Sequence, residues 1–417
     1  MTSKKKLSTP KTGLSRRNLL GAAAAAPLGA VVAKTTQASA AVPDDHVDLG
    51  KSYAFYGEGP QAGIQTAPQR YSQFMTFNLT SLNPRDIQIL LARWSAAIAQ
   101  MMAGKPVGLV DPERDNAVVL ETGEALDLGP ASLTVTVGLG PKVFSDVKGL
   151  DAYKPPLMRS LHDLPGDALK AELSGGDLAV QACADDPQVT YHAVRILARI
   201  AKAAGVASTR WAIMGFGRAS AGPGQTTPRN LLGFRDGTRN ITTQDDYDRF
   251  VWIKDGPEWQ HDGSYMVSRK VRMFIESWDT DRVDDQNDVF GRFKVSGAPL
   301  SGEHEFDEPD FEAVKKNGDT VIPKTSHMSL AAHENMGGLK LLRRSYNYTD
   351  GINEVGMLDA GLHFVSYQND PAIFEAIQSR LGSLDRLNEY ISHIGSAIFF
   401  APPAPQKGSY IGAYMFT

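Results

Sequence analysis

The sequence has only one cysteine, Cys183, among its 417 residues. An intramolecular disulfide therefore cannot form, and a metal site built on several cysteine ligands is excluded. The sequence also lacks an HExxH pattern, which leaves a mononuclear zinc enzyme with little support. Stability must come from buried apolar side chains. Apolar residues of all kinds make up 42% of the sequence, which is enough for two domain-sized cores.

Acidic residues are missing from residues 1–40, which carry seven basic ones. Residues 15–20 read SRRNLL, a twin-arginine pattern, and an alanine-rich apolar stretch and the small residues Ala38-Ser39-Ala40 follow. This order predicts a twin-arginine signal peptide over residues 1–40, with an apolar stretch shorter than the roughly 20 residues that span a bilayer. An amphipathic N-terminal helix is the alternative. Twin-arginine export serves proteins that fold first, often around a cofactor, so a periplasmic or extracellular protein with a prosthetic group is expected.

A long apolar run is absent beyond residue 40, so we expect a soluble protein without a stable membrane anchor. Without its first 40 residues the chain keeps 36 basic residues against 47 acidic ones, a net charge near −11. An excess of negative charge argues against nucleic acid and anionic lipid as partners.

The first half of the chain shows strand and helix patterns in a recognisable order. Strands are expected at residues 71–80, 132–138, 177–183 and 211–217, and helices at residues 84–103 and 188–204. Strand, helix, strand, strand, helix, strand is the order of a ferredoxin-like fold, in which two helices cover one face of an antiparallel sheet.

The second half repeats this scheme. Strands are expected at residues 268–278, 361–368 and 397–401, and helices at residues 281–292 and 371–381. The segments LAVQACADDP (178–187) and LHFVSYQNDP (362–371) each combine a half-buried strand, an Asp-Pro turn and a helix start, although chance similarity is the alternative. We therefore predict an α+β fold of two tandem ferredoxin-like domains, residues 41–220 and 221–417, with a Gly/Pro-rich linker at residues 219–229.

The segment GFRDGTRN, residues 233–240, stands near the predicted junction, where ligands often bind. Gly233 and Gly237 permit positive φ angles, so Asp236 can be displayed on a turn that lies close against a ligand. Two interpretations stay open. Asp236 is either part of a solvated Asp-Gly turn, the commonest use of that dipeptide, or a general base beside a bound ligand.

Two of the nine histidines, His327 and His333, lie in the poorly periodic stretch SHMSLAAHENMGG. Either could face a large planar cofactor, since haem iron is commonly held by one histidine. Five others have structural or solvated explanations: His46, His192, His261, His304 and His363.

Five separated motifs occur in the order seen in one enzyme family: GFRDGT (233–238), VFGRFKVSGAPL (289–300), SH (326–327), LLRRSYNY (341–348) and IFFAPP (398–403). The chain resembles the dye-decolourising (DyP-type) haem peroxidases, and most of all their exported branch, which includes deferrochelatases. The resemblance implies two ferredoxin-like domains in one chain, a homodimer or larger homo-oligomer, and haem b between the sheet and helices of the C-terminal domain. Hydrogen peroxide and a dye or other bulky organic reductant would be the substrates.

The resemblance also implies catalytic roles. Asp236 matches the family's distal aspartate, which moves a proton during peroxide cleavage, and Arg343 matches the distal arginine, which stabilises the negative charge that develops. Gly237 and Thr238, directly after the aspartate, are expected beside the cofactor. Ile241 departs from the family pattern, because a proline is common there.

The iron ligand and its partners follow from the same comparison. His327 matches the proximal ligand, although His333 competes with it because this chain lacks the usual Asn-Pro-Arg run there. Arg292 matches an arginine that contacts a haem propionate. The carboxylate of Asp385 is expected to accept a hydrogen bond from the ring nitrogen of the histidine that does not bind the iron, with Glu389 as the alternative acceptor.

Two rival functions use similar residues. The same pocket would serve a deferrochelatase, which captures haem and releases its iron, and the same scaffold would serve a haem-free binding module. Reductants too large for the pocket would need electron relays, for which four aromatic residues qualify chemically: Trp278, Tyr346, Tyr348 and Tyr390.

Overall fold

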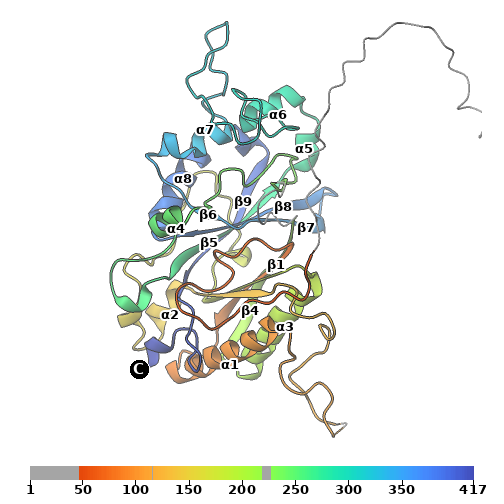
Figure 1. Ribbon diagram of the computed structural model, residues 1–417, viewed down its shortest axis with the longest axis vertical. Coiled ribbons are helices and arrows are strands. Elements are labelled where there is room, and N and C mark those ends of the chain that lie inside the picture. Colours follow the sequence, from red (N-terminus) through yellow and green to blue (C-terminus); the bar gives the residue numbers. More distant parts are fainter. Residues whose placement is uncertain (1–46, 115, 218–226) are drawn as a thin grey trace, which may run out of the picture. The chain divides into compact units, whose positions relative to one another are not determined.

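The computed structural model describes residues 47–114, 116–217 and 227–417. The predicted signal peptide and most of the predicted linker lie outside these residues. The described chain is organised around one nine-stranded sheet, with helices packed at its two ends (Figure 1). None of the described helices has the length and apolar character needed to cross a membrane.

The first half contributes four strands and two long helices. Their bounds are β1 Tyr71–Leu79, α1 Pro84–Met102, β2 Thr134–Leu139, β3 Leu178–Ala184, α3 Pro187–Ala203 and β4 Ala207–Phe216, with the short helix α2 at Pro141–Asp146. The strands pair antiparallel in the order β2-β3-β1-β4. Both long helices have proline as their first residue, directly after an N-cap residue whose side chain accepts backbone hydrogen bonds. The side chain of Asn83 accepts from Arg85 N, and that of Asp186 accepts from Gln188 N and Val189 N.

The second half has the remaining strands. Their bounds, with the helices between them, are α4 Gln244–Phe250, β5 Ser264–Met273, α5 Ile275–Asp279, α6 Val283–Phe290, α7 His327–Ala331, β6 Leu342–Arg343, β7 Tyr346–Ile352, β8 Leu358–Gln368, α8 Pro371–Leu384 and β9 Ile391–Ala401. Here β7, β8, β5 and β9 pair antiparallel in that order, and β6 adds to β8.

The two sets of strands join into one sheet that closes on itself. Strand β4 pairs with β7, β2 pairs with β9, and β5 pairs with both β8 and β9. The described residues from 47 to 417 accordingly form one compact unit. The predicted α+β class is confirmed. The strands do not separate into two sheets as expected, because β2–β9 and β4–β7 bridge the halves, and the division into two ferredoxin-like domains stays a prediction.

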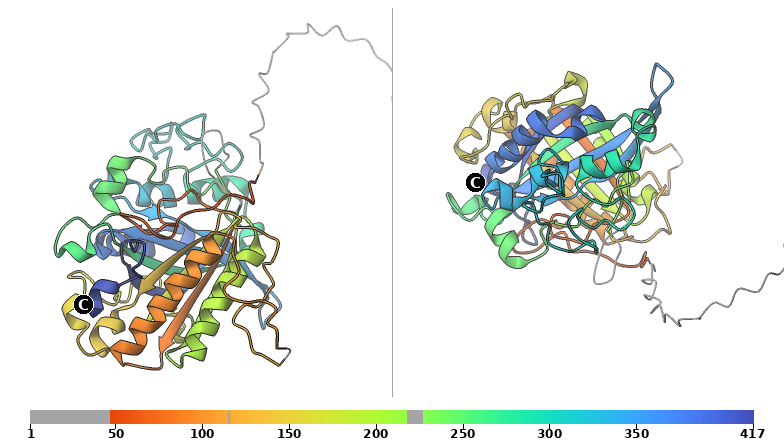
Figure 2. Two further views of the ribbon diagram at one scale, coloured as in Figure 1. Left: turned by 60° about the horizontal axis from the view of Figure 1, so that its bottom comes forward. Right: turned by 90° about the horizontal axis from the view of Figure 1, so that it is seen from above.

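The two largest apolar clusters of the described residues follow from the alternation of side chains along the strands. One lies between the first-half strands and helices α1 and α3, which Figure 2 shows side by side across the sheet. The other fills the inside of the closed sheet, where Phe74, Tyr348 and Phe399 are fully buried. Strand β3 is buried along its whole length because it separates these two cores.

The strand predicted at residues 268–278 was wrong at its C-terminal end. Strand β5 ends at Met273, and Trp278 lies in helix α5. The indole Nε1 of Trp278 donates to the carbonyl of Leu232 at 3.0 Å, and its ring packs edge-on against Tyr390. A short apolar run does not distinguish strand from helix. The contacts of Trp278 with residues distant in the sequence favour the helix here.

Candidate functional site

A cavity of about 260 Å³ lies between strands β5, β8 and β9 and helices α7 and α8. Its walls are mainly apolar, and Val271, Met273, Leu362, Phe364, Phe374, Ile377, Leu381 and Ile391 contribute to them. All seven residues predicted for the site line this cavity: Asp236, Gly237, Thr238, Arg292, His327, Arg343 and Asp385. The chain thus brings together groups that are up to 149 residues apart in sequence.

His327 begins helix α7, directly after its cap residue Ser326. Its Nδ1 lies 2.6 Å from Oδ2 of Asp385, which is almost fully buried, whereas 34% of the imidazole surface is open toward the cavity. The other oxygen of Asp385, Oδ1, accepts from Leu387 N at 2.9 Å, which fixes the orientation of the carboxylate. A backbone bond from Arg386 N to Thr325 O holds the two segments together.

The charges around His327 set its protonation. Burial lowers its pKa, but the negative charge and hydrogen bond of Asp385 outweigh this, so the pKa is raised above its usual value. Asp236 raises the pKa further and Arg343 lowers it. These two side chains are therefore close enough to His327 for their charges to act on it.

Asp236 directly precedes a turn and is not part of it. The turn spans Gly237 to Asn240, with Gly237 at a φ of 130°, a conformation that favours glycine. The backbone N–H of Asp236 donates to Pro228 O at 2.8 Å, and the neighbouring Phe234 is stacked on Phe290 in a buried cluster. The carboxylate is 20% exposed and accepts a hydrogen bond from Nη1 of Arg343.

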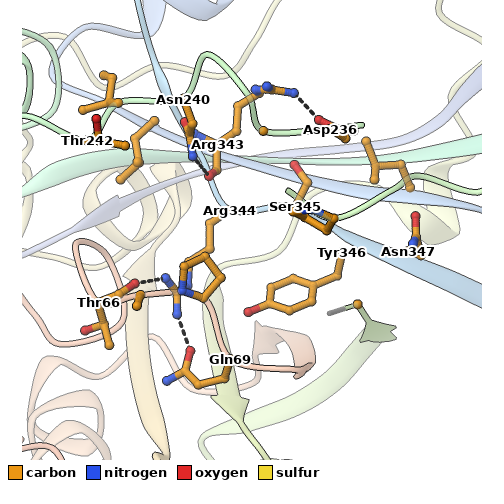
Figure 3. A pocket seen from close by; sticks show the side chains of 18 of the residues that line it. Thr66, Gln69, Asp236, Asn240, Thr242, Arg343, Arg344, Ser345, Tyr346 and Asn347 are labelled. Atoms are coloured by element: carbon orange, nitrogen blue, oxygen red, sulfur yellow. Dashed lines mark hydrogen bonds and ion pairs between the residues drawn. The ribbon is translucent and has the colours of Figure 1, made fainter. Parts of the chain in front are cut away.

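Asn240 holds Arg343 in place, a role that sequence reasoning missed. Its side-chain Oδ1 accepts from Arg343 N at 2.8 Å, and its Nδ2 donates to Arg343 O at 2.7 Å (Figure 3). This pair of bonds ties strand β6 to the segment that carries Asp236. Because the two residues are 103 positions apart, nothing in the sequence near Asn240 signals the contact.

The family resemblance implies a reaction with peroxide at Arg343, and replacing Asn240 with alanine is expected to slow that reaction by about 10- to 100-fold, since small misplacements of a catalytic group have effects of that size. The lost bonds should also cost about 1–3 kcal/mol of stability. Asn369→Ala is the control, because its Nδ2 donates to Arg249 O at 3.0 Å, an asparagine-to-backbone bond away from the cavity. Stopped-flow rates and denaturant unfolding measure both effects, and equal rates for the two variants would contradict the positioning role.

Charged side chains line the rim of the cavity. Arg292 is 8% exposed, and its Nη1 donates to the carbonyls of Gly297 and Glu305. Burial lowers its pKa, and the nearby charge of Arg239 lowers it further. Thr238 donates to Glu305 Oε1 at 2.9 Å. Arg239 is itself paired with Glu308 and Glu334, so the rim carries both signs of charge, and Arg292 is the buried cation beside which an anionic group would be stabilised.

Three of the described histidines line the cavity: His327, His333 and His393. The sequence had singled out only the first two. His333 lies at its rim, with Nδ1 3.2 Å from the half-exposed carboxylate of Glu334. His393, which sequence reasoning did not consider, has its Nε2 3.1 Å from Nε2 of Gln378, and burial lowers its pKa to about 3. Glu389, the alternative partner of the ligand histidine, lies outside the residues that line this cavity.

A second cavity of about 280 Å³ shares Asp236 and Arg343 with the first. Figure 3 shows Arg343 and Arg344 pointing to opposite sides of the extended chain, as neighbouring residues of a strand do. Arg344 donates to Thr66 O and to Gln69 Oε1. The Asp236–Arg343 pair therefore stands at the wall between the two cavities, whereas His327 lines only the first.

The described halves of the chain match two family models. The model of Dyp-type peroxidase, N-terminal, matches residues 61–217, and that of Dyp-type peroxidase, C-terminal, matches residues 227–406. Together they cover most of the chain.

Relatives agree with these matches. The protein named deferrochelatase from Yersinia pestis bv. Antiqua (strain Nepal516) is 34% identical over 388 residues, 89% of this chain and 87% of the relative. Among solved structures, the X-ray generated oxyferrous complex of DtpA from Streptomyces lividans is 36% identical, with a TM-score of 0.81 over 88% of this chain and 99% of that one. A DyP-type peroxidase from Streptomyces coelicolor is 37% identical, with a TM-score of 0.80 over 87% and 97%. This chain belongs to the Dyp-type peroxidase family.

Proposed function

We propose that the protein is a haem peroxidase that reduces hydrogen peroxide and oxidises dyes or other bulky organic reductants. One observation carries the proposal: a single cavity is lined by an imidazole bonded to a buried carboxylate and by a carboxylate–guanidinium pair. Membership of the family supports it, since related structures are described as oxyferrous and ferric complexes.

The residues that line the cavity fit haem. Apolar side chains from β5, β8, β9 and α8 suit the faces of a macrocycle, and Arg292 with its neighbour Arg239 suits the propionates. His327 has its Nδ1 occupied by Asp385, so Nε2 is the nitrogen that would hold the iron. The carboxylate of Asp385 increases the basicity of that ligand. Gly237 and Thr238 would lie beside the cofactor without bonding the metal.

The bound haem supplies the iron on which the oxygen–oxygen bond of peroxide is broken. The carboxylate of Asp236 accepts a proton from one oxygen of hydrogen peroxide and returns it to the other, directly or through one water. Arg343 stays protonated at every relevant pH, and its five N–H groups serve both Asp236 and the oxygen on which negative charge develops. The partly buried setting strengthens both interactions.

Release of iron from haem is the second candidate, because the relatives with 34% identity are named deferrochelatases. The same side chains would bind haem in either case. The two functions differ in what they consume, since a peroxidase requires peroxide and releases no iron.

Peroxide-dependent oxidation of an anthraquinone dye tests the proposal, with iron release under anaerobic reducing conditions measured on the same preparation. We expect dye oxidation that depends on peroxide and on bound haem. Iron release without peroxide-dependent dye oxidation would favour the deferrochelatase, and protein purified without haem that fails to bind added haem would refute both.

Three further features of this function are proposed. Residues 1–40 direct twin-arginine export to the periplasm or the cell exterior, so N-terminal sequencing of the exported protein should begin near residue 41.

The chain divides into ferredoxin-like domains at residues 41–220 and 221–417, of which the second binds haem. It assembles as a homodimer or larger homo-oligomer, which the mass of the purified protein in solution tests.

A further inference from the structure

A long segment without regular structure separates helix α1 from strand β2. The part of residues 103–133 that the structure describes contains no helix or strand. The segment runs beside helix α3 (Figure 2), where Nη2 of Arg199 donates to Val119 O at 2.7 Å. Loops of this length in a compact domain are uncommon and are usually either functional or linker segments.

Three titratable side chains meet where this segment reaches the helix: Glu121 and Glu124 from the segment and His192 from α3. Glu121 is 3% exposed and His192 is 5% exposed. One ligand atom from each residue can be chosen so that all three lie within 4.8 Å of one another. This cluster is far from the chemistry described above, because none of its members lines either of the two cavities.

The three side chains converge without hydrogen bonding to each other. Nδ1 of His192 lies 3.4 Å from Oε1 of Glu124, and Nε2 lies 3.6 Å from Oε1 of Glu121. Nδ1 of His192 and both carboxylate oxygens of Glu124 are buried without a hydrogen-bond partner. Ligand atoms held about 2.0–2.1 Å from a tetrahedral cation are themselves about 3.4 Å apart. The spacing of His192 Nδ1 and Glu124 Oε1 fits this value, whereas Nε2 faces Glu121 from the other side of the ring.

Hydrogen bonds and an ion pair hold the two carboxylates in place. Glu121 accepts backbone N–H bonds from Val107, Thr122 and Gly123 at 2.6–2.8 Å. Arg195 balances one charge, at 3.2 Å from Oε2 of Glu124, and leaves Oε1 facing the histidine. Two carboxylates and one arginine leave one excess negative charge while His192 is neutral, and a bound cation would balance it.

We propose that Glu121, Glu124 and His192 bind a divalent transition metal of the zinc class, with Nδ1 of His192 as the nitrogen ligand. One imidazole with two carboxylates suits zinc better than calcium or magnesium, which prefer oxygen ligands alone. The metal joins the 103–133 segment to helix α3, a cross-link in a chain whose single cysteine cannot form an internal disulfide. The site is independent of the proposed peroxidase function.

The test uses the purified haem-loaded protein, dialysed against EDTA and titrated with Zn²⁺. Elemental analysis should find one zinc per chain, and Zn²⁺ should raise the melting temperature and slow proteolysis of the exposed stretch around Val118. His192→Gln and Glu124→Gln should each weaken zinc binding at least about ten-fold. Arg195→Gln is the matched control, because it removes the ion pair to Glu124 and keeps all three ligands.

Three results would overturn the proposal. If wild-type protein binds no zinc in the titration, the cluster is an ion-pair network around a protonated His192. If wild type and His192→Gln bind zinc equally, the metal binds elsewhere. If Arg195→Gln weakens binding as much as Glu124→Gln, the loss reflects local stability and not coordination. The wild-type measurement decides the first point even where a variant fails to fold.

Discussion

Replacing His327 with alanine is expected to abolish stable haem binding. The haem content of the purified variant should fall at least about ten-fold, because the proposed iron–nitrogen bond would be lost together with the basicity that Asp385 would confer on it. The intense absorption band of the porphyrin in the purified protein, compared with protein concentration, measures the effect. The apolar walls of the cavity stay intact, so residual weak binding of haem is compatible with the expectation.

Two other histidines of the same cavity provide controls. His333→Ala should keep its haem, because the partner of that imidazole is the half-exposed Glu334 and not a buried carboxylate. His393→Ala should also keep it, since its Nε2 is engaged by Gln378. Loss of haem in His333→Ala with retention in His327→Ala would reverse the assignment of the ligand.

Misfolding of His327→Ala must be separated from the loss of a ligand. Free imidazole is small enough to take the place of the deleted ring, and it should restore haem binding to a correctly folded variant. The bond from Arg386 N to Thr325 O does not involve the deleted side chain, so the local backbone should persist. Failure of imidazole to restore the spectrum, with native-like unfolding, would argue that His327 is not the ligand.

Sequence reasoning located the helices and strands whose pattern is local. Helices α1 and α3 have regular apolar spacing and capped proline starts, and both lie within one or two residues of their expected bounds. It failed where the pattern was apolar but not periodic, as at the end of β5. It also could not predict the closure of the sheet, because the pairing of β2 with β9 depends on the single register pair Leu139 and Phe400.

The site shows the same limit. The family resemblance named seven residues, and all of them line one cavity, although their chemical roles stay predictions. Asn240 was missed because its importance lies in two bonds to the backbone of a residue 103 positions away. His393 was missed because it lies in the middle of a strand, where a histidine has no distinguishing local signal. Motifs identify the groups that perform the chemistry, but the residues that position them emerge only from tertiary contacts.

Arg343→Leu is expected to slow the reaction with hydrogen peroxide more than Asp236→Asn does. Removing a preorganised donor to a developing oxyanion typically costs about 10²–10³ in rate, and removing a general base about 10²–10⁴. These ranges overlap, so the local structure must decide the order. Stopped-flow measurement of the second-order rate constant with peroxide, on haem-loaded protein, gives the comparison.

The order follows from what each variant leaves behind. In Asp236→Asn the guanidinium remains to stabilise negative charge, and water can still carry the proton. In Arg343→Leu the carboxylate of Asp236 loses its ion-pair partner and stays, only 20% exposed, beside the oxygen on which negative charge must develop. At an effective dielectric constant near 20, two unit charges about 4 Å apart interact by about 4 kcal/mol, which is enough to outweigh the loss of a proton carrier.

The double variant Arg343→Leu/Asp236→Asn tests whether the unpaired charge of Asp236 causes the loss. If the orphaned charge of Asp236 causes the larger loss, then Arg343→Leu combined with Asp236→Asn should react faster than Arg343→Leu alone, and the two substitutions should not be additive. Arg343→Lys, which keeps the positive charge and loses the planar donor set, should fall between wild type and Arg343→Leu. A double variant slower than Arg343→Leu by the full factor of Asp236→Asn would show that the two side chains act independently. The arginine would then serve the oxyanion alone, and the hydrogen bond between Arg343 and Asp236 would have no part in the rate.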